Sequence, residues 1–215
     1  PFSINTNREW EYRRAMPVAV YIIVLLCVVI HLFIKLELTT SQWIDVVYRF
    51  GVVKYDFRWY SVFTCTFLHG GWMHLIGNML FLLVYGSTLE RFLGTGRFLL
   101  LYFAGALFSI LVHLLTISPF FIDVPTIGAS GAISAVLGAF FVLLPTARLK
   151  CVFLFFLRPL IVTLPAYVVL GLWFAVQLYF SIEPVSMSGE VAFWAHVAGF
   201  ASGALVGSLL HGQLL

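Results

Sequence analysis

Ser130 is the residue of this 215-residue chain whose setting best suits a nucleophile. It stands in the run Gly128-Ala129-Ser130-Gly131, directly before an apolar stretch that ends at Pro145. Glycines let a chain turn tightly, so we expect Ser130 at the N-terminus of a short helix. Free backbone N–H groups and the positive end of the helix dipole favour an alkoxide or a developing oxyanion there. Taken alone, however, such a run of small residues is more typical of packed helix pairs in membranes.

A serine nucleophile needs a general base within hydrogen-bond reach, and the chain offers six histidines. They are His31, His69, His74, His113, His196 and His211. Four of them lie at about the depth of Ser130 when positions are counted from the nearest charged residues: His31, His74, His113 and His196. Depth therefore does not single out one base. We place His211 at the membrane interface, because it lies at the end of its apolar stretch.

Small residues favour His196 as the base. Three glycines follow this histidine at one residue per helical turn: Gly199, Gly203 and Gly207. A matching small stripe lies on the apolar stretch that follows the nucleophile: Ser130, Ser134 and Gly138. Such stripes permit close approach of two helices, and this pair would bring Ser130 Oγ within reach of the His196 ring.

His74 and Asn78 lie four residues apart and so share one face of a helix. Both side chains donate hydrogen bonds without a fixed charge, which suits an oxyanion; the alternative is a polar network between helices. His69 precedes them in a loop and would orient loop and helix. His31 and His113 stand between large apolar residues, and we expect each to be structural and hydrogen-bonded to a neighbour. Since no acidic residue lies at this depth, we expect a Ser–His dyad.

The elements that must position these residues are apolar. Hydrophobic residues make up 62% of the chain and charged residues only 10%, with a mean hydropathy of +1.04. This composition excludes a soluble enzyme, a disordered chain and a nucleic-acid-binding domain. Three well-separated cysteines, Cys27, Cys65 and Cys151, have no metal-ligand spacing and are expected to be small apolar fillers. We expect neither a metal nor another cofactor.

Six stretches are long and apolar enough, or nearly so, to cross a membrane as helices. They cover residues 17–36, 72–89, 98–118, 130–145, 160–180 and 192–211. The sequence therefore predicts an all-α polytopic membrane protein, a bundle of six transmembrane helices in one domain over 17–215, with a cytoplasmic N-terminal segment over 1–16. The fourth stretch would be only about 22 Å long as a helix, so its Ser130 end should lie within the bilayer, in a protein-lined cavity.

Basic residues predict the orientation of the chain. Eight lie on the inner side if the N-terminus is cytoplasmic: Arg8, Arg13, Arg14, Arg91, Arg97, Arg148, Lys150 and Arg158. Four then lie outside: Lys35, Arg49, Lys54 and Arg58. This excess favours cytoplasmic N- and C-termini in a plasma or inner membrane. The long outer loop at 39–70 mixes charges with aromatic residues and is expected at the lipid–water interface, and 146–159 is expected to be an inner interfacial connector.

In combination, four motifs resemble the rhomboid intramembrane serine proteases. They are His69-x4-His74-x3-Asn78, Glu90-Arg91-x2-Gly94-x-Gly96, Gly128-x-Ser130-Gly131 and Ala195-His196-x2-Gly199-x3-Gly203. Their order and their placement on six spans agree with that family over residues 17 to 211. The resemblance implies an endopeptidase, embedded in the lipid bilayer, that cleaves transmembrane segments of single-span membrane proteins near the outer face.

The resemblance also implies roles for single residues. Ser130 would be the nucleophile and His196 the general base, while His74, Asn78 and the Ser130 N–H would form the oxyanion hole. Supporting positions would be Gly128, Gly131, Gly199, Glu90 and His69. The loop 39–70 would lie sideways in the outer leaflet, Glu90 would brace the inner loop, and the fifth helix at 160–180 would be the lateral gate for substrate.

Two positions depart from the family pattern. Members often carry Trp-Arg in the first loop, where this chain has Trp59-Tyr60. Some have an aromatic residue one turn after the nucleophile that stacks on the catalytic histidine. Here that residue is Ser134, so His196 must be held in another way.

Two other functions stay open beside the protease. One is a non-catalytic rhomboid-like protein that binds transmembrane helices, but such relatives lack the serine or the histidine. The other is a transporter lined by histidines, yet no carboxylate or thiolate joins them as a plausible ligand set. The protease is therefore the favoured hypothesis.

Overall fold

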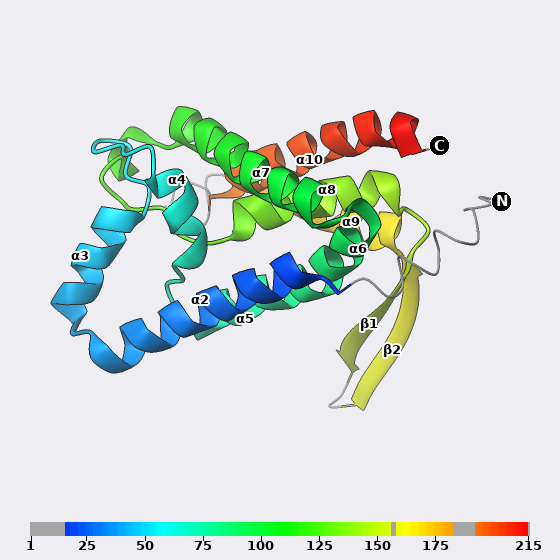
Figure 1. The fold of residues 1–215 in the computed structure, drawn as a ribbon, viewed down its shortest axis with the longest axis horizontal. Coiled ribbons are helices and arrows are strands. Elements are labelled where there is room, and N and C mark those ends of the chain that lie inside the picture. The colour runs from blue at the N-terminus through cyan, green and yellow to red at the C-terminus, as the bar shows by residue number, and fades with distance from the viewer. Residues whose placement is uncertain (1–15, 156–157, 183–191, 215) are drawn as a thin grey trace.

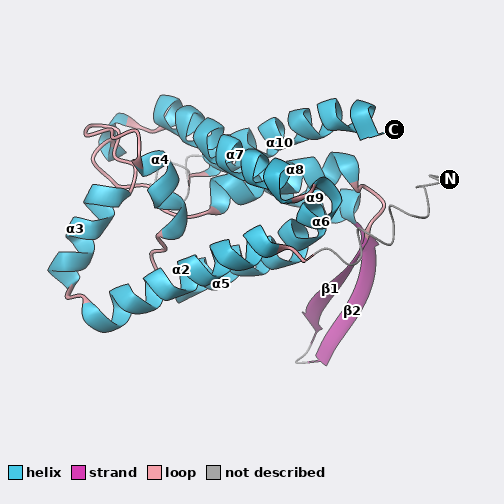
Figure 2. Ribbon diagram, viewed as in Figure 1, coloured by secondary structure: helices cyan, strands magenta, loops and turns pink. Residues whose placement is uncertain are grey.

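The structure is a computed structural model that describes residues 16–155, 158–182 and 192–214 (Figures 1 and 2). Its helices are α2 (Val18–Glu37), α3 (Thr40–Phe50), α4 (Ser61–Thr64), η1 (Cys65–Phe67), α5 (Trp72–Phe81), the π-helical turn η2 (Leu82–Gly86), α6 (Ser87–Leu93), α7 (Thr95–Thr116), η3 (Pro119–Phe121), α8 (Ser130–Leu143), α9 (Ala166–Ile182) and α10 (Phe193–Leu214). Its strands are β1 (Arg148–Phe155) and β2 (Arg158–Pro165).

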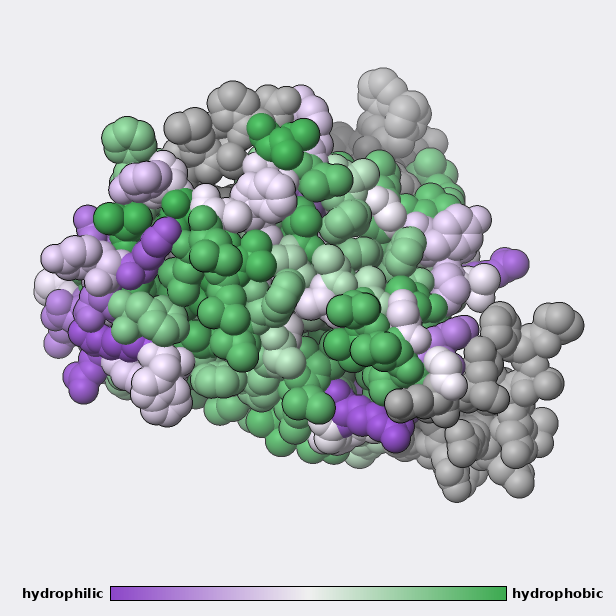
Figure 3. Space-filling model, turned by 90° about the horizontal axis from the view of Figure 1, so that it is seen from above, coloured by the Kyte–Doolittle hydropathy of each residue, from purple (hydrophilic) through white to green (hydrophobic). Residues whose placement is uncertain are grey.

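Within the described residues, four helices are long and apolar enough to cross a membrane: Val18–Glu37, Trp72–Leu93, Thr95–Thr116 and Phe193–Gly212. The second of these runs through α5, η2 and α6. Two shorter apolar helices, α8 and α9, accompany them. Apolar side chains cover the middle of the face drawn in Figure 3, and hydrophilic ones gather toward its two ends. The predicted all-α polytopic fold is confirmed, and the chain is an integral membrane protein.

The connection between α8 and α9 is an antiparallel hairpin that the sequence did not predict. β1 pairs with β2 from Arg148 opposite Pro165 to Phe155 opposite Arg158. The prediction of a helix from residue 160 is therefore wrong at its start, since 160–165 belong to β2. Both strands carry β-branched or aromatic residues, which favour extended backbone, and Pro165 has no N–H to continue the pairing. The hairpin projects away from the helices in Figure 2.

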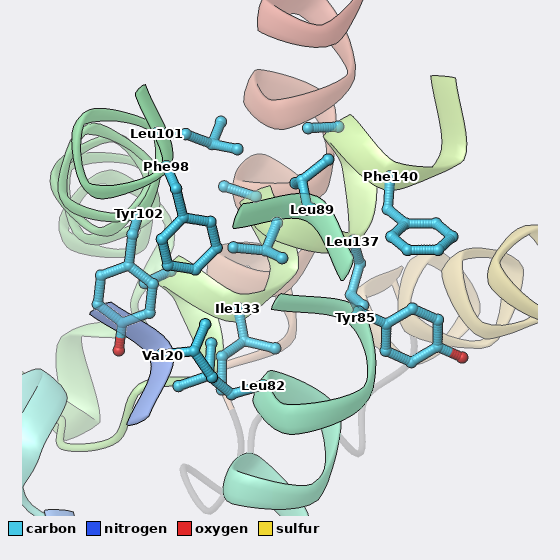
Figure 4. Close-up of a cluster of buried hydrophobic side chains, with 14 of the residues drawn as sticks. Val20, Leu82, Tyr85, Leu89, Phe98, Leu101, Tyr102, Ile133, Leu137 and Phe140 are labelled. Carbon is cyan, nitrogen blue, oxygen red and sulfur yellow. The ribbon is translucent and has the colours of Figure 1, made fainter. Parts of the chain in front are cut away.

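The core lies where α2, the second spanning helix, α7 and α8 meet (Figure 4). The side chains labelled there are all buried: Val20, Leu82, Tyr85, Leu89, Phe98, Leu101, Tyr102, Ile133, Leu137 and Phe140. Gly86 allows α2 to come close, because a side-chain carbon at this position would lie 3.1 Å from Val20 Cγ2. Cys27 and Cys65 are free and buried, as expected of small apolar fillers.

Glu90 ties the start of α2 to the connection between α6 and α7. Its buried carboxylate accepts hydrogen bonds from the backbone N–H groups of Ala19 and Val20, each at 2.9 Å. It also accepts the Thr95 hydroxyl at 2.8 Å. The first N–H groups of a helix lack partners inside it, and a negative charge suits that end of the dipole. Glu90 therefore fixes three helices at one end of the molecule.

Helices α8 and α10 are parallel and pack closely through small residues. A side-chain carbon at Gly138 would overlap the carbonyl of Phe200, and one at Gly203 would overlap the carbonyl of Ala135. The two backbones are thus in direct contact, as the two small-residue stripes predicted. This contact brings the first turns of both helices together.

The loop at 39–70 folds against the segment that enters α8, where Val52 pairs with Thr126. It contains α3, a helix without buried residues whose N-terminus is capped by Thr39 and Gln42. The Tyr60 hydroxyl donates to the Arg49 carbonyl at 3.1 Å, and the Thr64 hydroxyl donates to the Phe50 carbonyl at 2.6 Å. Tyr60, which replaces the arginine of the family pattern, thereby fastens the end of α3 to the loop.

Candidate active site

The turn before α8 presents Ser130 at a helix N-terminus. Ser130 is the first residue of α8, and the N-cap residue Ala129 makes no side-chain hydrogen bond to the free N–H groups. Gly128 has a φ of +122°, which favours glycine, and a side-chain carbon there would lie 2.6 Å from His74 Nε2. The Gly128 N–H donates to the Cys65 carbonyl at 2.9 Å. This turn leaves the first N–H groups of α8 free to bind a developing negative charge.

The structure brings Ser130 and His196 together, as expected from the sequence. Ser130 Oγ lies 2.8 Å from His196 Nε2. The Ser109 hydroxyl donates to the Gly131 carbonyl at 3.1 Å. A side-chain carbon at Gly199 would lie 2.7 Å from Ser109 Oγ. The pair therefore sits where α7, α8 and α10 touch, in a contact that accepts only small side chains.

The second ring nitrogen of His196 has a partner on α9. His196 Nδ1 lies 2.8 Å from Gln177 Oε1. The ring of Trp173 lies beside the imidazole, with centroids 6.3 Å apart and planes 36° apart. Ser134 does not approach the histidine through a hydrogen bond; its hydroxyl donates to the Ser130 carbonyl at 2.7 Å. Apart from its bond to Ser130, the His196 ring is thus held from α9, and Ser134 of α8 makes no hydrogen bond to it.

Neither contact from α9 was predicted. Gln177 is the only amide side chain in the stretch 160–180, and polar residues inside apolar spans usually have a function, so a signal existed for it. The sequence alone did not place it on the face of α9 that meets α10. Trp173 resembles the other aromatic residues of the stretch, so no sequence signal separates it from a lipid-facing side chain.

The predicted site residues line a cavity of about 780 Å³. Ser130, His196, His74 and Asn78 all line it. Asn78 is only 8% exposed, and its Nδ2 has no hydrogen-bond partner among the described residues. Leaving a buried N–H unpaired costs free energy, which an incoming oxygen would recover. The cavity therefore combines a serine–histidine pair with a free amide donor and a second histidine.

His69 supports His74 and does not line the cavity. It is fully buried, and its ring centroid lies 5.1 Å from that of His74. Burial, and next the proximity of His74, lower the pKa of His69 to about 4, so this side chain is neutral near pH 7. His31 is also buried and packs edge-on against Trp72, with centroids 4.7 Å apart. Its ring nitrogens have no hydrogen-bond partner among the described residues, contrary to our expectation.

His113 organises the loop before the nucleophile. Its Nε2 lies 2.8 Å from Thr126 Oγ1, which is the expected hydrogen bond to a neighbour. The backbone of Thr126 pairs with that of Val52 through two hydrogen bonds of 2.8 and 2.9 Å. His211 lies near the end of α10, about four turns beyond His196. In the parts of the chain that the structure describes, no three His, Cys, Asp or Glu side chains are close enough together to hold a metal ion.

The family model and the curated relatives that this chain matches are all of one kind. Residues 56–213 match the Rhomboid domain family. The chain is 31% identical over 137 residues to the putative rhomboid protease YdcA of Bacillus subtilis, covering 64% of this chain and 67% of that protein. It is 31% identical over 151 residues to the rhomboid protease GluP of the same organism, covering 70% of this chain but only 26% of GluP. It is 36% identical over 165 residues to RHOMBOID-like protein 4 of Arabidopsis thaliana, covering 74% of this chain and 36% of that protein.

Proposed function

Because this chain belongs to the rhomboid family, we propose that it is an intramembrane serine endopeptidase that cleaves transmembrane segments of single-span membrane proteins near the outer face. The observation that carries the proposal is the 2.8 Å hydrogen bond between Ser130 Oγ and His196 Nε2 at a cavity that also contains His74 and Asn78. A serine next to a base and facing hydrogen-bond donors is the arrangement that acyl transfer requires.

In the proposed reaction, Ser130 Oγ attacks the carbonyl carbon of the scissile peptide bond while His196 Nε2 takes its proton. The carbonyl oxygen becomes an oxyanion that accepts hydrogen bonds from the Ser130 N–H, His74 and Asn78. The intermediate collapses when His196 gives the proton to the leaving amine. Water then attacks the acyl ester with His196 again as the base, which restores Ser130. The reaction needs no cofactor.

The proposed substrates follow from the position of Ser130 within the bilayer. The peptide bonds of a transmembrane helix are hydrogen-bonded and shielded by side chains, so the segment must unwind before it can meet Ser130. Gly128 and Gly131 flank the nucleophile and lie close to His74 and Ser109, so we expect bulky groups to fit poorly next to the cleaved bond. We therefore expect cleavage at Gly, Ala or Ser, near helix-weakening residues in the outer part of the segment.

The two rival functions fit the site less well. A non-catalytic helix-binding protein has no need of a serine hydroxyl 2.8 Å from an imidazole nitrogen. A transporter lined by histidines would use His31 and His113, but the former packs against Trp72 and the latter bonds Thr126.

We also place both termini in the cytoplasm and the protein in a plasma or inner membrane, from the excess of inner basic residues.

Reconstitution in liposomes with a single-span substrate tests this function. The wild-type protein should cleave a segment with Gly-Ala near its outer end, and Ser130→Ala should not. Replacing the glycines of that segment by leucine should lower kcat/KM stepwise, because glycine is about 1 kcal/mol worse than the best helix formers inside a helix. A poly-leucine segment cut as fast as the glycine-containing one would contradict the unwinding argument.

A further inference from the structure

Gln177 is the one described residue that bonds the ring nitrogen of His196 facing away from the nucleophile. Its Oε1 lies 2.8 Å from Nδ1, and the Nε2 on the opposite side lies 2.8 Å from Ser130 Oγ. The three side chains therefore form one continuous line, with Ser130 on α8, His196 on α10 and Gln177 on α9. The last of these has no part in the reaction proposed above.

The Gln177 amide oxygen bears on which ring nitrogen of His196 carries the proton. In the structure the Gln177 amide turns its oxygen toward Nδ1, and because that oxygen accepts and does not donate, this orientation requires the His196 proton on Nδ1. Nε2 is then unprotonated and can accept the Ser130 hydroxyl proton, as a general base must. If the other tautomer formed, the proton on Nε2 would block that transfer. With Oε1 facing Nδ1, the bond to Gln177 thus matches the productive tautomer and orients the plane of the ring.

The described surroundings of His196 contain no other group with this ability. The residue one turn after the nucleophile, Ser134, donates its hydroxyl to the Ser130 carbonyl. Trp173 and Phe193 lie near the ring but offer only their aromatic surfaces, with centroids 6.3 and 6.4 Å away. Aromatic contact restricts the tilt of the imidazole but does not distinguish its two nitrogens.

We infer that Gln177 is a positioning residue for His196, an inference that rests on the proposed function. Its amide oxygen accepts the Nδ1–H, orients the ring and keeps Nε2 free to receive the proton of Ser130. It takes the place that a carboxylate holds in a serine–histidine–acid triad, but without a negative charge. Because Gln177 belongs to α9, the alignment of His196 also depends on α9 staying packed against α10. Few residues of α9 are buried: only Ala166, Leu170 and Ser181.

Three variants of Gln177 separate positioning from simple packing. Gln177→Met keeps the length of the side chain and removes the acceptor, so kcat and the rate of labelling by a fluorophosphonate should fall together. Loss of a group that orients a metal-binding histidine typically costs about 10- to 100-fold, and we expect a loss of this size for His196. KM should stay within about threefold, because the orientation of the base acts on the chemical step.

Gln177→Glu restores an acceptor at the same reach and should recover most of the labelling. Gln177→Asn keeps the amide but is one methylene too short, and should behave like Gln177→Met.

Controls make each outcome decisive. Leu178→Met introduces the same side chain on the neighbouring, lipid-facing position of α9 and should label at the wild-type rate. Labelling of Gln177→Met at the wild-type rate, or equal loss in the Met and Glu variants with unchanged thermal stability, would overturn the inference. If the Met variant does not fold, the Asn and Glu variants decide in the same way. A wild-type protein that is not labelled at all would instead refute the proposed function.

Discussion

At the scale of single residues, the described lining of the candidate site contains no acidic side chain. In a triad, the carboxylate both selects the histidine tautomer and stabilises the imidazolium that forms during attack. Gln177 can do the first but carries no charge for the second. More of the transition-state stabilisation must then come from donors that face the oxyanion, and the Asn78 amide lines the cavity with no hydrogen-bond partner for its Nδ2 among the described residues.

The oxyanion donors give the first prediction. Asn78→Ala and His74→Ala should each lower kcat by about 100- to 1,000-fold, the usual cost of removing one such donor, while KM changes little. Steady-state kinetics with a single-span substrate in detergent measures both constants. Ile76→Ala is the matched control, since Ile76 lies on the same helix with its side chain 54% exposed. Unchanged kcat in both variants would assign His74 and Asn78 to helix packing.

Some of these residues could be identified from the amino-acid sequence and others could not, for physical reasons. Ser130 and His196 could be paired because small residues at one per turn mark a face on each helix, and two such faces meet. His31 was expected to bond a neighbour because it is polar in an apolar span, but the structure buries it against Trp72. Gln177 could not be placed, since the small residues of its stretch, Gly171 and Ala175, lie on another side of the helix and do not mark the face that meets α10.

At the scale of elements, the site depends on how closely α8 and α10 approach. Gly203→Ala should lower thermal stability, because the added methyl group would overlap the Ala135 carbonyl and force the helices apart. Overpacking of this kind typically costs about 1–3 kcal/mol. Labelling of Ser130 should fall as well, since separation of the helices lengthens its bond to His196.

Gly212→Ala is the matched control for that prediction. Gly212 is on the same helix, and a side-chain carbon there would meet no atom within 4 Å. This variant should be as stable as the wild type or slightly more stable, because alanine favours helix more than glycine does. Differential scanning fluorimetry in detergent compares the two. Equal melting temperatures for the two variants would show that the α8–α10 contact does not require glycine at 203.

The elements also show where hydropathy is informative. Long apolar stretches located the spanning helices to within a few residues, since crossing a bilayer needs about 20 apolar residues. The β1–β2 hairpin was not predicted, because its strands are as apolar as a membrane-spanning helix. The hydropathy of a short apolar run does not distinguish a strand from a helix. Its β-branched residues and Pro165 were the available signals.

At the scale of the whole molecule, the start of α2 and the end of α10 lie at the same end (Figure 1). We predict that this end is cytoplasmic, because it collects the larger share of basic residues. A green fluorescent protein fused to the C-terminus should fluoresce, and alkaline phosphatase fused there should be inactive. Phosphatase fused after Thr40, in the predicted outer loop, should be active. The reverse pattern would invert the orientation and place Ser130 toward the inner leaflet.

Covalent labelling of the nucleophile tests the proposed serine–histidine mechanism most directly. Wild-type protein in detergent is treated with a fluorophosphonate, digested and mapped by mass spectrometry, alongside Ser130→Ala and His196→Ala. We expect a single modification on Ser130 in the wild type and none above background in either variant, because the hydroxyl reacts only when His196 accepts its proton. Modification of another residue, or labelling of His196→Ala at the wild-type rate, would contradict it.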